Sequence, residues 1–357
     1  MLWSNRQRMR LRDFYVTGNR NLPAILLDIR LMSFLQFMTV NILRTSLALT
    51  RLEQMLDRLS RAIRGQHMGG RLVVAIMLLS ATTALSAAER YYIAHRGEYR
   101  ALKDGEAVVD APEGTRPTFE RVRDKKINAV KLDLHCTADN VIVVSHDPNL
   151  KRTTGKDLPI IETKYEDLKD VLFLKKGEFE DERILTLDEA LKIVKDCPLF
   201  FVDFKYHTPE MMTNAFKAFD ANGIPRDRIM LATFTHWALE DAQKRYPEVR
   251  RVSHIHYKQE EDGTFLLNGK VKCADFNEVL KQMATWKKEM GLHGFNLPTS
   301  SSETTVEVIR KLKADGCWLS IWYVHSLETV DKYKDSGVDG FVTGMPSAVR
   351  EYESKKE

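Results

Sequence analysis

The chain has 357 residues, a length that fits one large α/β domain or two ordinary ones. Its formal net charge of +4 is unevenly distributed: residues 1–67 hold 11 Arg, no Lys and 4 acidic residues, whereas residues 88–357 hold 42 basic and 46 acidic residues. The net acidity of this larger part argues against a nucleic-acid-binding surface, and four widely spaced cysteines argue against a disulfide framework or a zinc site.

The break in composition coincides with a predicted secretory signal peptide at residues 68–88. A basic start is followed by an apolar run at 72–79 and small residues at 84–88, and the apolar run is too short to span a bilayer. We therefore expect an exported, periplasmic or extracellular protein with no stable membrane span in its mature chain. Residues 1–67 are interpreted as a mis-called or disordered Arg-rich extension before a true start at Met68. The alternative is a genuine, partly helical N-terminal segment.

From residue 91 onward, short apolar runs alternate with longer amphipathic runs, as strands alternate with helices. We assign residues 89–357 to a (β/α)8 barrel, the TIM barrel, because about 270 residues of such alternation suit it better than an open sheet. One strand is surplus, and the turn at 137–140 is so short that its two strands are alternatively a local hairpin. The expected strands are 91–94, 127–134, 141–145, 199–204, 229–234, 252–256, 295–297, 319–324 and 340–343. The expected helices are 118–126, 187–196, 210–222, 237–246, 277–290, 304–315 and 327–336.

Charged residues stand within or just after several of these strands. Lys131 and Asp133 share one face of their strand, because strand side chains alternate, and so do Asp203 and Lys205. One such residue alone is best explained by an internal salt bridge or a satisfied core histidine. Several at the C-terminal ends of barrel strands predict a polar ligand, because buried charges are costly unless paired or bound. The set comprises His95, Arg96, Lys131, Asp133, His146, Asp203 and Lys205.

Phosphoryl transfer is the chemistry that suits this set. Carboxylates can hold a hard divalent cation, whereas Arg and Lys side chains can clamp phosphate oxygens. Two histidines can act as general base and general acid on the two exchanging oxygens. Catalysis of this kind depends mainly on positioning and on stabilising charge.

His95-Arg96-Gly97 opens a series of motifs whose order, over residues 91–347, resembles that of the glycerophosphodiester phosphodiesterase family, which begins with His-Arg-Gly. Pro112-Glu113-Gly114-Thr115 is loosely similar to the family's Pro-Glu-Asn-Thr. The further matches are Lys131-Leu132-Asp133 for Glu-x-Asp, Thr137-Ala138-Asp139-Asn140 for Thr-x-Asp-Gly, Val143-Val144-Ser145-His146-Asp147 for Val-Val-x-His-Asp, residues 185–189 for Pro-Thr-Leu-Glu-Glu, Asp203-Phe204-Lys205 for Glu-x-Lys, residues 322–325 for Trp-x-Val-Asn, and residues 337–346 for Gly-Val-Asp-Gly-x-x-Thr-Asp-x-Pro.

The resemblance implies a barrel that hydrolyses small-molecule glycerophosphodiesters, such as those derived from phospholipids, to glycerol 3-phosphate and an alcohol. It implies that His95 and His146 are the catalytic acid and base. The implied substrate-binding residues are Arg96, Lys205, Lys131 and Trp322. The implied ligands of Ca²⁺ or Mg²⁺ are Asp133 and Asp203, with Glu113 able to lend a further carboxylate. Tyr99, the loop at 102–111, Phe234, Trp237, Trp322 and Tyr323 are candidates to line the pocket.

Lys131 stands where the family has a metal-binding Glu. The summed charge of the positions of Lys131, Asp133 and Asp203 is therefore −1, whereas it is −3 with the family's residues. An ammonium does not suit the coordination shell of a divalent cation. Asp203, His325 and Gly344 likewise replace Glu, Asn and Asp. Either Glu113 supplies a carboxylate, or Lys131 swings out, or Lys131 pairs with an aspartate and fills the site with an internal ion pair.

Two functions follow from these alternatives. The first is a divergent phosphodiesterase that binds metal through rearranged ligands or uses Lys131 as a fixed positive charge. The second is a catalytically impaired pseudoenzyme that binds phosphodiesters or lipid headgroups. The presence of both His95 and His146 favours the enzyme, because a binding protein has no need of an acid and a base.

Overall fold

The computed structural model describes residues 90–356. The predictions of an extension at residues 1–67 and of a signal peptide at residues 68–88 concern positions outside this range. Within it, no helix combines the length and the apolar character that crossing a membrane requires.

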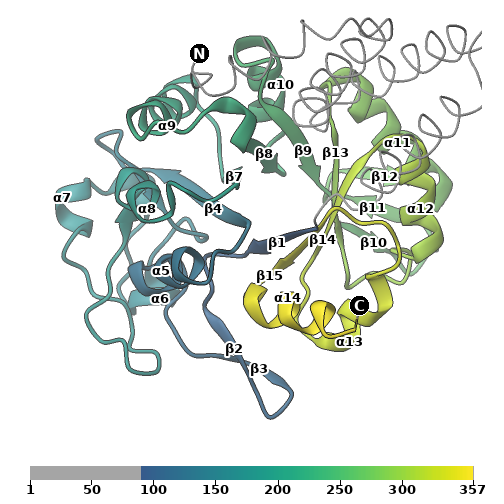
Figure 1. Cartoon of the computed structure of the whole chain (residues 1–357). Helices are drawn as coiled ribbons and strands as arrows, with labels where there is room; N and C mark the ends of the chain where they lie inside the picture. The colour runs from purple at the N-terminus through teal and green to yellow at the C-terminus, as the bar shows by residue number, and fades with distance from the viewer. Residues whose placement is uncertain (1–89, 357) are drawn as a thin grey trace, which may run out of the picture. The chain divides into compact units, whose positions relative to one another are not determined.

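Eight parallel strands close into a barrel, which confirms the predicted TIM-barrel fold (Figure 1). The ring closes because β1 pairs in parallel with β15 on one side and with β4 on the other. Its strands are β1 (Tyr91–Ala94), β4 (Ala129–Cys136), β7 (Leu199–Phe204), β8 (Ile229–Thr233), β9 (Arg250–His254), β13 (Gly294–Pro298), β14 (Trp318–Trp322) and β15 (Gly340–Thr343).

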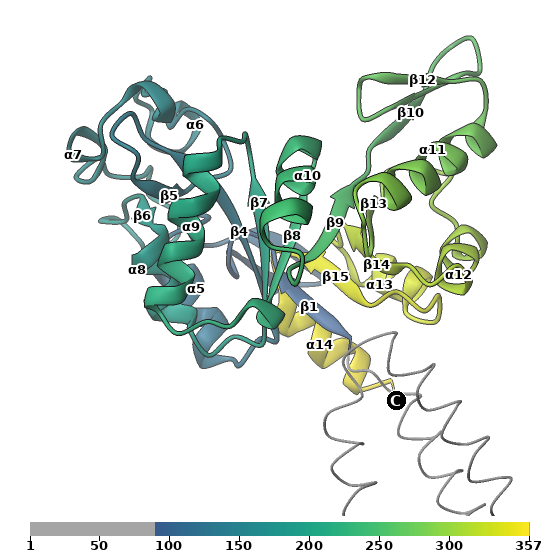
Figure 2. The ribbon, with the colours of Figure 1, turned by 90° about the horizontal axis from the view of Figure 1, so that it is seen from above.

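Helices surround the ring and bury apolar side chains against it (Figure 2). Helix α8 begins at a capping box, in which the Thr186 hydroxyl accepts from the Glu189 backbone and Glu189 accepts from the Thr186 backbone. Thr115 lies at the N-cap of α5, but its hydroxyl donates to the carbonyl of Pro112 at 2.6 Å and does not cap the helix. The predicted helices are α5 (Arg116–Asp124), α8 (Leu187–Val194), α9 (Pro209–Ala221), α10 (His236–Arg245), α11 (Phe276–Glu289), α12 (Val306–Ala314) and α13 (Leu327–Tyr333).

The surplus strand is β5 (Ile142–Val144), which forms a hairpin with β4. Their antiparallel register pairs Leu134 with Val144, and β6 (Leu185–Thr186) adds to the free side of β5. Asn140 in the connecting turn has a φ of 64°, a left-handed conformation that Asn tolerates. The hairpin alternative is therefore confirmed. It brings His146, just beyond β5, back toward β4.

Several elements were not predicted. The hairpin of β2 (Arg100–Lys103) and β3 (Glu106–Val109) turns at Asp104 and Gly105, which both have positive φ. A three-stranded antiparallel sheet of β10 (Tyr257–Gln259), β11 (Phe265–Leu267) and β12 (Val271–Cys273) extends beyond the barrel beside α11 (Figure 2). The others are α6 (Lys151–Thr154), α7 (Tyr165–Leu168), α14 (Pro346–Ser354) and the 3-10 turns η1 (Ile160–Glu162) and η2 (Arg226–Arg228).

The barrel interior is apolar at one end and polar at the other. Its apolar layer consists of Ile93, Ala129, Leu199, Phe201, Met230, Ala232, Val252 and Val342. Nearer the C-terminal ends of the strands lie the buried polar residues Lys131, Asp133, Asp203, His254, Asn296 and Ser320. The parallel register of β4 and β7 places Asp133 beside Asp203. The side-chain alternation of the sequence is thus converted into a cluster of charges inside the ring.

Candidate active site

The turn after β1 fixes the first catalytic candidate. His95 is 3% exposed, and its backbone donates to the carbonyl of Thr343 on β15 at 2.8 Å. Arg96 and Gly97 follow with φ values of 58° and 77°. A Cβ on Gly97 would lie 2.4 Å from the hydroxyl oxygen of Thr118, so only glycine fits here. The tight turn lets His95 and Arg96 both face the barrel mouth.

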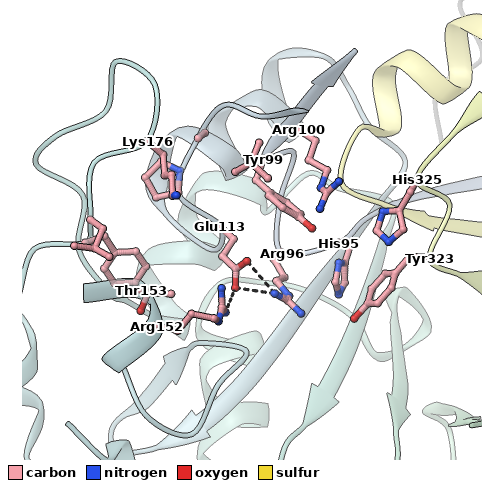
Figure 3. A pocket seen from close by; sticks show the side chains of 15 residues that line it. His95, Arg96, Tyr99, Arg100, Glu113, Arg152, Thr153, Lys176, Tyr323 and His325 are labelled. Atoms are coloured by element: carbon pink, nitrogen blue, oxygen red, sulfur yellow. Dashed lines mark hydrogen bonds and ion pairs between the residues drawn. The ribbon is translucent and has the colours of Figure 1, made fainter. Parts of the chain in front are cut away.

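The structure brings the two predicted catalytic histidines together. The ring centroids of His95 and His146 are 6.4 Å apart, and the rings are inclined at 78°. The Tyr323 ring packs on His95 with a centroid separation of 4.4 Å (Figure 3). His146 Nδ1 lies 2.7 Å from a carboxylate oxygen of Asp147, which Arg152 also contacts. This contact orients the His146 ring and leaves Nε2 as the atom available to a substrate.

Both imidazoles are neutral at pH 7. Burial, together with the nearby positive charges of Lys205 and Arg96, lowers the pKa of His146 to about 4, against the opposing effects of Asp133 and Asp147. Burial, Arg96 and Lys131 hold the pKa of His95 well below its ordinary value. A neutral imidazole can accept a proton, so both rings are competent as bases in the free protein.

A cluster of four ionised side chains fills the mouth of the barrel beside these rings. The ammonium of Lys131 contacts the carboxylates of both Asp133 and Asp203, the latter at 2.9 Å. Lys205 contacts the same two carboxylates at 2.9 Å each. Burial raises the pKa of each carboxyl, but the two ammonium groups outweigh it and keep both pKa values well below the usual range. The cluster is therefore an internally neutral set of two cations and two anions.

A buried chain of polar groups supports this cluster from behind. His254 Nε2 lies 3.4 Å from the bound oxygen of Asp203, and the Asn296 side-chain nitrogen lies 3.0 Å from His254 Nδ1. The Ser320 hydroxyl donates to Asn296 at 2.7 Å. Because these groups are buried and partnered, they hold the Asp203 side chain in one position.

The side chains predicted to hold a divalent cation do not fit one. Both carboxylate oxygens of Glu113 accept hydrogen bonds from the Arg96 guanidinium, at 2.8 and 2.9 Å, and Arg152 forms an ion pair with the same carboxylate. Among the described residues, one buried oxygen of Asp133 has no hydrogen-bond partner, but an ammonium contacts its other oxygen. In residues 90–356 no three His, Cys, Asp or Glu side chains are arranged as metal ligands. A cation bound between the two aspartates would lie against two ammonium groups, so the third alternative, an internal ion cluster, is the one observed.

A cleft of about 420 Å³ opens beside His95 (Figure 3). A smaller hollow shares His95 and Tyr323 with it and reaches the ion cluster. The cleft is lined mainly by His95, Arg96, Tyr99, Arg100, Glu113, Arg152, Lys176, Tyr323 and His325. The hollow is lined mainly by Lys131, His146, Asp203, Lys205, Phe234 and Trp322. Of the aromatic candidates, only Trp237, which is 74% exposed, lines neither space.

Several residues of this site were missed from the sequence, among them His254, Arg152, Arg100 and Lys176. His254 ends β9 just as the candidate histidines follow their strands, so the same signal was available for it. Arg152 lies on the short helix α6 and Arg100 on the hairpin after β1, where nothing in the local pattern marks them. Their presence depends on how the two loops fold over the barrel mouth.

Comparison with known proteins identifies the family and agrees with the barrel fold. Residues 95–348 match the model of the Glycerophosphoryl diester phosphodiesterase family. A glycerophosphodiester phosphodiesterase of Caldanaerobacter subterraneus is 24% identical over 267 residues, which are 72% of this chain and 95% of that protein. A human lysophospholipase D is 32% identical over 145 residues, 37% of this chain and 43% of that protein. A solved phosphodiesterase of Oleispira antarctica, in complex with the product sn-glycerol-3-phosphate, has a TM-score of 0.58 at 20% identity and covers 73% of this chain and 96% of its own. The chain therefore belongs to the glycerophosphoryl diester phosphodiesterase family of phosphoric diester hydrolases.

Proposed function

We propose that this protein hydrolyses a glycerophosphodiester to glycerol 3-phosphate and an alcohol, with His95 and His146 exchanging the protons. The observation that carries the proposal is the 6.4 Å separation of the two rings beside a cleft lined by cations. An acid and a base on either side of a bound phosphate are what hydrolysis of a phosphodiester requires.

His146 suits the role of base. The contact with Asp147 at Nδ1 leaves Nε2 to take a proton from water as the water oxygen attacks phosphorus. His95 then gives a proton to the oxygen of the departing alcohol. The negative charge of a bound phosphodiester favours the protonated imidazole, so substrate binding raises the pKa of His95 from its low value in the free protein. His146 takes one proton from water and His95 delivers one to the alcohol. Transfer of one proton through solvent from His146 to His95 then restores the starting protonation states.

Positive charge for the phosphate comes from side chains. Arg96 lies next to His95, and Lys131 and Lys205 present ammonium groups in the hollow that reaches His146. Family members typically depend on a divalent metal, and the carboxylates here are already neutralised by ammonium groups. We therefore assign charge stabilisation in this chain to Lys131 and Lys205, with Asp133 and Asp203 holding them in place.

The test is release of glycerol 3-phosphate from glycerophosphocholine, glycerophosphoethanolamine and glycerophosphoglycerol by the full chain, with chelator and with added Mg²⁺ or Ca²⁺. We expect turnover, and a loss of about 100-fold or more in kcat for His146→Ala, the range typical of a general acid or base. The matched control is His256→Ala, because the His256 side chain is exposed and lines neither the cleft nor the hollow. Equal rates for the two variants would refute the assignment.

A second function, phosphodiester binding without catalysis, is favoured by one observation, the saturation of Lys131 and Lys205 by the two aspartates. Calorimetry separates the two functions. A binding protein would retain heat of binding for glycerophosphodiesters with no turnover under any cation, and His146→Ala would leave that affinity unchanged.

A further inference from the structure

The cleft beside His95 carries more positive charge than one phosphodiester needs. Of the described residues that line it, four have cationic side chains, namely Arg96, Arg100, Arg152 and Lys176, and one, Glu113, is acidic. Glu113 is shared by Arg96 and Arg152, and Arg152 has Asp147 as a second partner. Within residues 90–356, Arg100 and Lys176 are therefore the lining cations with no carboxylate partner.

Arg100 is the better fixed of these two cations. Its guanidinium lies over the Tyr99 ring at 5.5 Å and makes one long hydrogen bond, to the carbonyl of Ala107 at 3.4 Å. Its Nε is buried and has no hydrogen-bond partner in the described chain. Figure 3 shows the guanidinium between Tyr99 and His325, and all three residues line the cleft. Burial and then the charge of Arg100 lower the pKa of His325, so this charge acts on the rim of the cleft.

Gly344 explains why the guanidinium has this place. A Cβ on Gly344 would lie 2.8 Å from Cε1 of Tyr99 and 3.0 Å from Cδ of Arg100. The two side chains occupy the space that any larger residue would fill. The motif that Gly344 belongs to has Asp at this position, which would both crowd and neutralise Arg100. Glycine therefore leaves a cation whose charge is available to a ligand.

We propose that Arg100, supported by Lys176, forms a subsite for a second anionic group, a phosphate or a carboxylate, on the alcohol part of the diester. This proposal rests on the proposed function and narrows its substrate class to glycerophosphodiesters with an acidic headgroup. A planar guanidinium with unused donors binds such a group through paired, charge-assisted hydrogen bonds. The cleft volume of about 420 Å³ lies in the range of small-molecule sites.

The experiment compares three substrates of the full chain: glycerophosphoethanolamine with a cationic headgroup, glycerophosphoglycerol with a neutral one, and glycerophosphoglycerol phosphate with an anionic one. Glycerophosphoserine tests a carboxylate in place of the second phosphate. We expect kcat/KM to rise in the order cationic, neutral, anionic, with about tenfold between the last two. In Arg100→Gln this ratio falls to near one. The matched control is Lys103→Gln on the same hairpin, which removes an exposed charge outside the cleft and keeps the ratio.

The same ligands are also measured by calorimetry on His146→Ala, where turnover plays no part. If no substrate is hydrolysed but the anionic ligand binds about tenfold more tightly than the neutral one, and Arg100→Gln removes the difference, catalysis is refuted and the subsite stands. If the protein hydrolyses the substrates without preferring the anionic headgroup, the subsite is refuted and the proposed function stands. An unchanged ratio in Arg100→Gln would also overturn the subsite.

Discussion

Replacing Lys131 by glutamate tests the role of the ion cluster at the barrel mouth. Two ammonium groups now face two carboxylates, and Lys131, Asp133 and Asp203 are only 4%, 2% and 2% exposed. In Lys131→Glu a single ammonium, that of Lys205, would face three carboxylates, a net charge of −2 in a buried space. In chelator, the variant should therefore be less stable than the parent protein. Its three carboxylates should also attract a divalent cation.

The expected loss of stability in Lys131→Glu follows from the burial of the cluster. Breaking a buried ion pair costs about 3–5 kcal/mol, because an uncompensated charge remains. At about 2 °C per kcal/mol for a domain of this size, the melting temperature should fall by about 6–10 °C in chelator. A divalent cation at 100 times its dissociation constant would restore about 2.7 kcal/mol, or about 5 °C.

The assay is thermal unfolding followed by circular dichroism, in EDTA and in Mg²⁺ or Ca²⁺, for the parent protein, Lys131→Glu and the control Lys103→Glu. Only Lys131→Glu should be rescued by the cation, and its glycerophosphodiester turnover should become dependent on added metal. The reasoning fails if the parent protein is stabilised by the cation as much as the variant is. It fails equally if the variant melts like the parent in chelator.

Two further predictions concern His146 and the turn after β1. In the free protein the His146 imidazole should lose its proton as the pH rises through about 4, not 6.5, and binding of glycerol 3-phosphate should raise that pKa. NMR titration of the ring resonances measures both pKa values. A midpoint near 6.5 without ligand would contradict the burial argument. In urea unfolding, Gly97→Ala should destabilise the fold by about 1–3 kcal/mol more than Gly105→Ala does. Both glycines have positive φ, but only a Cβ at Gly97 would meet Thr118. Equal losses of stability in the two variants would show that the contact with Thr118 relaxes without cost.

The barrel was predictable because its signals are local. Apolar runs of strand length alternate with amphipathic helical runs, and β1, β7 and β15 begin and end at the expected residues. The β2–β3 hairpin was missed although Asp104-Gly105 is a strong turn signal, because its strands are half-exposed and carry charged residues. The small sheet of β10–β12 was missed for a different reason: each strand has only three residues, too few to show an alternating pattern, although Phe265 and Leu267 of β11 are buried in the core.

The candidate site was predictable only in part. Side-chain alternation placed Lys131 and Asp133 on one face, and the strand ends marked His95 and His146. The sequence left three alternatives for Lys131, because a four-carbon side chain can reach in several directions. The choice depends on β7, whose register places Asp203 within reach of the ammonium.

The sequence by itself determined the barrel, its family and the identity of most groups at its mouth, because strand periodicity and motif order are properties of neighbouring residues. Only the tertiary structure decided how those groups are paired. The neutral cluster around Lys131, the contacts of Glu113 with Arg96 and Arg152, and the position of Arg100 beside Gly344 each join residues that are distant in sequence or carried on separate loops. Electrostatic energy depends on distance and burial, and these quantities are set when strands and loops converge.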